Sequence, residues 1–196
     1  MFRYDAHDAY CYPGSSVLRN KAGLTDQASL DAFEADITAV RLLELSQLPL
    51  AGRFDLKRLQ KIHHAIFQDV YDWAGELRTV DISRGANRFA NVRQIIPYAQ
   101  TVFAALKQER FVQNLDPLPF AARLARYLSE INTLHPFREA NRRVQRAFAA
   151  QLATQAGYAL NYGGLTQEQM YPLIAAAFAG DEQPLTQLLA DRIVRL

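Results

Sequence analysis

The stretch HPFREANRRVQR (residues 135–146) decides how this chain is interpreted, because it places hydrogen-bonding and cationic side chains where a helix begins. Pro136 lacks a backbone donor and disfavours helical geometry at the residue before it, so His135 is expected in a loop. The next helix is predicted to begin between Glu139 and Asn141. The segment therefore predicts a loop histidine beside a helix N-terminus.

The start of this helix is an expected anion site. Its first backbone N–H groups have no partners within the helix. Arg142, Arg143 and Arg146 add positive charge at the end of the macrodipole that favours acids. Guanidinium groups match phosphate oxygens, so a phosphate chain is the expected ligand.

The remaining residues of the stretch fit chemistry on bound phosphates. Glu139 suits Mg²⁺, which prefers oxygen ligands and often shares them with a nucleotide. The imidazole of His135 suits removal of a proton from a hydroxyl, while Phe137 is expected in the core. These residues favour nucleotidyl or phosphoryl transfer to a hydroxyl.

A structural interpretation competes with this one. A lone loop histidine is usually structural, and an arginine-rich helix is usually a solvated face. Glu139 and Arg143 have the i, i+4 spacing of a local ion pair. The segment NRRVQR could contact RNA, but 22 Lys and Arg against 20 Asp and Glu, with no interleaved aromatics, argue against direct nucleic-acid binding.

Length and composition indicate one domain. The 196 residues, 49% of them hydrophobic, are enough for a sizeable core. The single cysteine, Cys11, excludes an internal disulfide and a cysteine-based metal site. The N-terminus lacks the apolar core of a signal peptide, and no apolar run approaches a membrane span, so we expect a soluble cytoplasmic protein with no membrane partner.

Apolar residues at helical spacing predict a mainly α chain. Helices are expected over residues 26–46, 56–70, 92–112, 117–134, 139–157, 166–179 and 182–194. Asp116 is a predicted cap, and Thr166 with Gln169 a predicted capping box. Turn formers in residues 75–92 predict one short β-hairpin or extended flap. His63 and His64 lie on an amphipathic helix and need no metal.

The stretch from His135 to Arg146 resembles the signature of the Fic domain family. That signature reads His, any residue, Phe, any residue, Asp or Glu, Gly, Asn, Gly, Arg, two residues, Arg. Residues 12–24, 67–85 and 151–162 also resemble bacterial Fic toxins. The resemblance implies one Fic domain over residues 1–196: a mainly α, Fic-type helical bundle with a β-hairpin flap at about 77–91 and a signature loop and helix over 135–157.

The resemblance also implies an activity, because family members typically transfer AMP from ATP to a protein hydroxyl. His135 would be the general base, and Glu139 would hold Mg²⁺ on the α- and β-phosphates. Asn141 would help form the anion hole, Arg143 would contact the phosphates, and Arg146 would reach the terminal phosphate. The flap would clamp the target as an added strand through Ile82, Ser83, Arg84, Gly85 and Phe89.

Two positions depart from the family signature, since Ala140 and Arg142 replace its two glycines. Alanine costs little unless φ is positive, but the side chain of Arg142 could fill the path of the phosphates. The related Doc toxins, which are kinase-like and transfer the γ-phosphoryl group, carry Ala-Asn-Lys-Arg here. AMP transfer, a Doc-like kinase and a degenerate Fic fold serving as a binding module all stay open.

The resemblance bears on regulation and partners as well. Many Fic proteins carry an inhibitory Ser/Thr, three residues, Glu, then Gly or Asn; near Ser29 this chain has Phe33 at the Glu position and Glu34 one residue late. The chain is then either unregulated or restrained by a separate small antitoxin that supplies a glutamate to Arg146, and by analogy with the compact toxins we expect the antitoxin. The target would be a hydroxyl-bearing protein, by analogy a type II topoisomerase.

Overall fold

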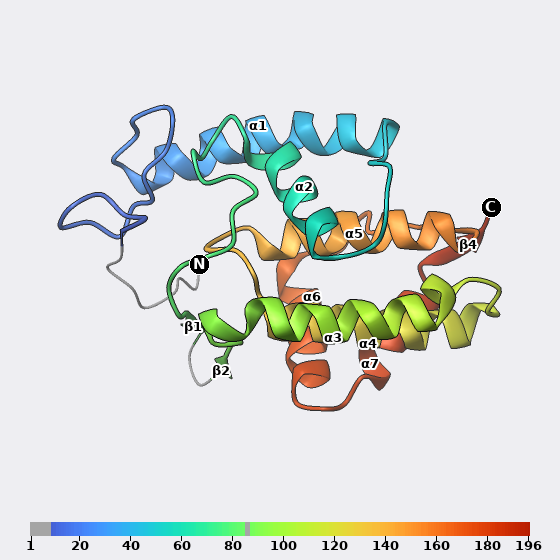
Figure 1. Cartoon of the computed structure of the whole chain (residues 1–196). Helices are drawn as coiled ribbons and strands as arrows, with labels where there is room; N and C mark the ends of the chain where they lie inside the picture. The colour runs from blue at the N-terminus through green and yellow to red at the C-terminus, as the bar shows by residue number, and fades with distance from the viewer. Residues whose placement is uncertain (1–8, 85–86) are drawn as a thin grey trace.

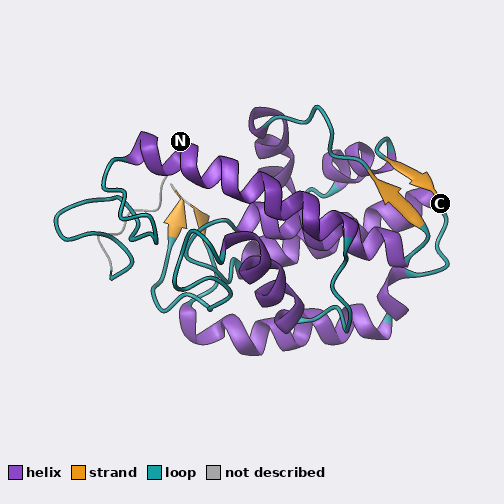
Figure 2. Cartoon of the chain, turned by 90° about the horizontal axis from the view of Figure 1, so that it is seen from above, coloured by secondary structure: helices purple, strands orange, loops and turns teal. Residues whose placement is uncertain are grey.

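The computed structural model describes residues 9–84 and 87–196. Within them the chain is mainly α-helical, as predicted, with short strands at two places (Figures 1 and 2). The helices are α1 (Gln27–Gln47), α2 (Leu56–Phe67), α3 (Ile95–Gln108), α4 (Pro117–Leu134), α5 (Asn141–Gln155), α6 (Gln167–Phe178) and α7 (Gln183–Ala190). Two 3₁₀ turns, η1 (Val92–Gln94) and η2 (Arg110–Val112), flank α3. None of the described helices has the length and hydropathy to cross a bilayer.

Helix α4 is the centre of the bundle, packing against α3, α5, α6 and α7 (Figure 1). Helix α5 packs against α2, and α2 in turn packs against α1. The predicted apolar stripe of α4 is entirely buried: Phe120, Leu124, Tyr127, Leu128, Ile131 and Leu134. Because these apolar residues recur every three or four positions, they lie on one continuous face of α4 that packs against the neighbouring helices.

One of the two predicted helix caps forms as expected, because Thr166 with Gln169 makes the capping box. Asp26, which was not predicted as a cap, accepts from Ser29 N at 2.8 Å at the start of α1. Asp116 occupies the cap position of α4 with Pro117 next, but its side chain makes no capping bond. It instead pairs with Arg195 at 2.7 Å, so a tertiary contact replaces the local one.

The flap contains the predicted β-hairpin, made of β1 (Ser83–Arg84) and β2 (Asn87–Arg88). The strands are antiparallel with Ser83 opposite Arg88. Gly85, which we expected in the clamping flap, lies outside the described residues. Ile82, directly before the hairpin, is buried.

Three predicted element boundaries are wrong. The helix expected over 92–112 ends at Gln108, after which Arg110, Phe111 and Val112 have positive φ. The helix expected over 56–70 ends at Phe67. The helix expected over 182–194 ends at Ala190. Beyond it, β4 (Ile193–Arg195) pairs with β3 (Tyr158–Leu160), which lies between the helices expected over 139–157 and 166–179.

Strand β4 depends on pairing with β3, which lies far from it in the sequence. Leu196 N donates to Gly157 O at 3.0 Å, next to the start of β3, so the chain end closes a ladder that local spacing does not encode. This sheet and the flap lie at opposite ends of the molecule (Figure 2). The second sheet is thus remote from the signature loop.

Candidate functional site

His135 lies in the loop between α4 and α5, as predicted. Its N–H donates to Ile131 O at 3.0 Å and ends α4, and its backbone is left-handed with φ 42° and ψ 61°. A side chain in that conformation costs roughly 1–2 kcal/mol, so the surrounding structure must hold it there. Ala140 caps α5 and is also left-handed, with φ 70°. Alanine at the family's first glycine position therefore does carry a backbone cost.

The signature loop between these residues is closed by reciprocal hydrogen bonds. Asn141 Nδ2 donates to Phe137 O at 2.8 Å, and Phe137 N donates to Asn141 Oδ1 at 3.0 Å. The side chain of Asn141 is buried and committed to the loop, so the phosphate contact expected of Asn141 would come from its backbone N–H. Phe137 is in the core, as predicted.

A buried histidine beneath the loop was not anticipated as part of the site. The ring of His63 packs on Phe137 with 4.2 Å between centroids, and His63 Nδ1 accepts from Gly75 N at 2.8 Å. Burial lowers the pKa of His63 to about 3, so it stays neutral. The sequence predicted only that His63 lies on an amphipathic helix, and the tertiary structure places it under Phe137.

A pocket joins His135 to the arginines of α5. Its polar lining includes His135, Arg142, Arg143 and Arg146. The rest of its lining is mostly apolar and comes from α6 and the flap: Phe89, Met170, Tyr171, Ile174, Ala175 and Phe178, with Asn132 of α4. Cationic and apolar side chains in one pocket fit a ligand with a phosphate chain and a flat ring.

The imidazole of His135 is held in a defined orientation. Only 3% of the residue is exposed, yet it lines the pocket and can be reached from it. His135 Nδ1 lies 3.2 Å from Asn132 O, an acceptor, so Nδ1 carries the proton and Nε2 is left as the basic nitrogen. Phe89 of the flap stacks on the ring with 3.7 Å between centroids and 20° between planes.

Arg143 forms an ion pair with a carboxylate that was not predicted from the sequence. Its guanidinium pairs with Glu34 on α1, and its Nη1 donates to Thr38 Oγ1 at 3.0 Å. Glu34 also accepts from the hydroxyl of Tyr71, whose pKa is raised by burial and by this carboxylate. The Glu34–Arg143 pair takes the place of the local ion pair considered between Glu139 and Arg143.

The other signature residues differ in their surroundings. Arg146 lies 5.4 Å from the ring centroid of Tyr162, while Arg142 lines the pocket at the family's second glycine position.

Glu139 is the candidate ligand for a metal ion, and its Oε1 accepts from Ala140 N at 3.0 Å. No group of three His, Cys, Asp or Glu is gathered for a metal in the described part of the chain. A single carboxylate at a helix start fits Mg²⁺ only when phosphate oxygens supply further ligands.

Comparisons with known proteins identify this arrangement. The model of the Fic/DOC family matches residues 53–153, which include the signature loop. The chain is 36% identical to "Protein adenylyltransferase VbhT" of Bartonella schoenbuchensis, covering 96% of this chain but 40% of that protein. It is 34% identical to "Probable protein adenylyltransferase Fic" of Escherichia coli, covering 97% of this chain and 94% of that protein.

A solved structure extends the likeness to the fold. The N-terminal Fic domain of a putative cell filamentation protein of Bartonella quintana, with bound ADP, superposes with a TM-score of 0.91 and 27% identity. The match covers 95% of this chain and 94% of that one. Signature, fold and relatives agree, and the chain belongs to the Fic/DOC family.

Proposed function

We propose that this protein transfers AMP from ATP to a hydroxyl side chain of a target protein. One observation carries the proposal: the imidazole of His135 and three arginines line one pocket together with apolar side chains. Relatives named protein adenylyltransferase and a similar Fic domain with bound ADP support it. The arginines bind the phosphates, and the apolar side chains of α6 are suited to the base.

The reaction assigns a task to each residue. His135 Nε2 removes the proton from the target hydroxyl as its oxygen bonds to the α-phosphorus of ATP. The bond between the α-phosphorus and the bridging oxygen to the β-phosphate breaks, and pyrophosphate leaves. Arg143 and Arg146 stabilise the charge on the departing phosphates. Glu139, together with phosphate oxygens, would hold Mg²⁺, which would supply further charge neutralisation.

The partners follow from the same proposal. The target segment adds as a strand to the flap and brings its hydroxyl to His135. A small antitoxin would restrain the toxin by presenting a glutamate to Arg146, and a type II topoisomerase is the proposed target class. The reaction would take place in the cytoplasm, where ATP is supplied.

A second candidate, a Doc-like kinase, is favoured by one specific observation. Arg142 lines the pocket where the family has glycine, so a third guanidinium lies along the phosphate path. A cation there could bind the chain in the opposite direction and present the γ-phosphate to His135. The acceptor hydroxyl would then carry a phosphoryl group instead of AMP.

Labelled ATP distinguishes the two reactions. The purified protein is incubated with cell lysate, Mg²⁺ and ATP labelled at either the α- or the γ-phosphate. We expect protein-bound α-label, no γ-label, and no transfer by His135→Ala, which should still bind ATP. Transfer of γ-label alone would overturn AMP transfer in favour of the kinase.

A further inference from the structure

Arg78 is a buried arginine between the flap and the signature loop. Its side chain has no exposed surface, although arginine is one of the residues least often fully buried. A buried cation is retained only where polar partners replace its water. The partners of Arg78 are therefore informative about its role.

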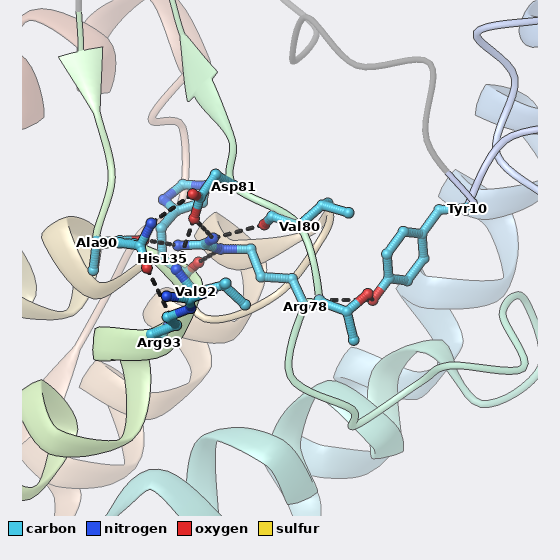
Figure 3. A network of polar contacts seen from close by, with 10 residues as sticks. Tyr10, Arg78, Val80, Asp81, Ala90, Val92, Arg93 and His135 are labelled. Atoms are coloured by element: carbon cyan, nitrogen blue, oxygen red, sulfur yellow. Dashed lines mark hydrogen bonds and ion pairs between the residues drawn. The ribbon is translucent and has the colours of Figure 1, made fainter.

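Three backbone carbonyls accept from this guanidinium (Figure 3). Arg78 Nε donates to His135 O at 2.8 Å, Nη1 donates to Val80 O at 2.7 Å, and Nη2 donates to Ala90 O. Val80 lies before the hairpin, Ala90 lies after it, and His135 lies in the loop. One planar side chain thus joins both ends of the flap to the proposed base.

Further contacts make this joint rigid. Arg78 N donates to Pro136 O at 2.9 Å, so the backbone of residue 78 also holds the loop. Arg78 Nη1 lies 3.6 Å from Asp81 Oδ1 (Figure 3). The same carboxylate oxygen accepts from Val92 N at 2.7 Å, across the base of the flap. Charge-assisted hydrogen bonds of this kind are the stronger ones in proteins.

The position of Arg78 matters because His135 is strained and covered by the flap. The carbonyl that Arg78 holds belongs to the residue with φ 42°. Phe89, which stacks on the imidazole, directly precedes Ala90, and Ala90 N donates to Thr133 O at 2.9 Å. Losing the guanidinium would release the backbone of His135 and the stacking partner of its ring together.

We propose that Arg78 is a positioning residue that holds the His135 backbone and the flap in one arrangement, so that the imidazole is aligned with a hydroxyl brought by the flap. Arg78 does not line the pocket, so it makes no direct contact with a nucleotide bound there, and its larger effect is on the rate of transfer. This inference rests on the proposed function for its kinetic consequence, but its structural consequence can be measured without any activity.

The test compares Arg78→Lys with a matched control, Arg58→Lys. Arg58 is likewise buried, and its Nη1 donates to Gly52 O at 2.8 Å, away from the flap. Lysine keeps the charge at both sites, but it replaces the three nitrogens of the planar guanidinium with a single nitrogen that does not span the same carbonyls. Arg78→Lys should lower kcat for AMP transfer about tenfold or more, with ATP affinity by calorimetry unchanged within about twofold, whereas Arg58→Lys should keep kcat.

A spectroscopic measurement tests the geometry directly. Stacking on Phe89 places the ring protons of His135 over an aromatic face, which shifts their NMR resonances upfield. These resonances are identified by their loss in His135→Ala. The upfield shift should largely disappear in Arg78→Lys and persist in Arg58→Lys.

Each outcome decides the proposal. An unchanged His135 shift and an unchanged kcat in folded Arg78→Lys would overturn it, as would equal losses of kcat in both lysine variants. If Arg78→Lys does not fold, Asp81→Asn is the deciding variant, because the side chain of Asp81 is 57% exposed and can be replaced without unfolding the protein. Asp81→Asn should reduce both the upfield shift of His135 and kcat, and no change in either would overturn the proposal. A wild type without transfer would refute the proposed function alone, since the shift would still report on Arg78.

Discussion

The buried imidazole of His63 should make the stability of this protein depend on pH. Its folded-state pKa is about 3, against 6.5 for an exposed imidazole. Because the folded value is the lower one, protonation favours the unfolded chain. The contribution of neutral His63 is complete above pH 6.5 and is lost as the pH falls toward 3. At pH 5 the loss is about 2 kcal/mol, from roughly 1.4 kcal/mol per pH unit.

The assay is urea unfolding at pH 8 and pH 5 of the wild type, His63→Asn and His64→Asn. Asparagine offers an acceptor for Gly75 N–H but does not titrate, and effects of acid on carboxylates cancel in the difference between variants. The stability advantage of the wild type over His63→Asn should shrink by about 2 kcal/mol at pH 5. His64 is exposed on the same helix, so His64→Asn should retain the wild-type pH dependence. An equal advantage over His63→Asn at both pH values would refute the reasoning.

Three further variants test the site. Ala140→Gly should change the free energy of unfolding by less than about 0.5 kcal/mol, because relief of the left-handed backbone offsets the lost methyl group. Its control, Ala149→Gly, removes a buried methyl group within α5 and should cost about 2 kcal/mol. Equal costs of the two substitutions in urea unfolding would contradict backbone strain at Ala140. Arg142→Gly should raise transfer of α-label, with Arg142→Lys as the charge-keeping control, and unchanged products and rates would show that Arg142 has no influence on the chemistry. Glu34→Gln should destabilise the fold by about 1 kcal/mol through the weakened pair with Arg143, and an unchanged urea midpoint would mean that the pair contributes nothing.

Local chemistry accounts for what the sequence predicted correctly. Pro136 alone placed His135 in a loop, and the helix start at Asn141 followed from the same few residues. The buried stripe of α4 follows from helical periodicity. The hairpin followed from turn formers around Ser83.

Contacts between residues far apart in the chain account for the features that were not predicted from the sequence. Glu34 reaches Arg143 across 109 positions, and the guanidinium of Arg78 binds a carbonyl 57 positions away. Strand β4 exists only because β3 is beside it. No spacing rule relates residues so far apart, so these partners became visible only in the folded chain.

The direction of the phosphate chain past Arg142 tests the proposed reaction most directly. A crystal structure of the protein with Mg²⁺ and a non-hydrolysable ATP analogue would locate each phosphorus relative to His135 Nε2. AMP transfer predicts that the α-phosphorus lies nearest to this nitrogen, with the β- and γ-phosphates on Arg143 and Arg146. A γ-phosphorus nearest to His135, or a nucleotide bound outside the pocket, would contradict it.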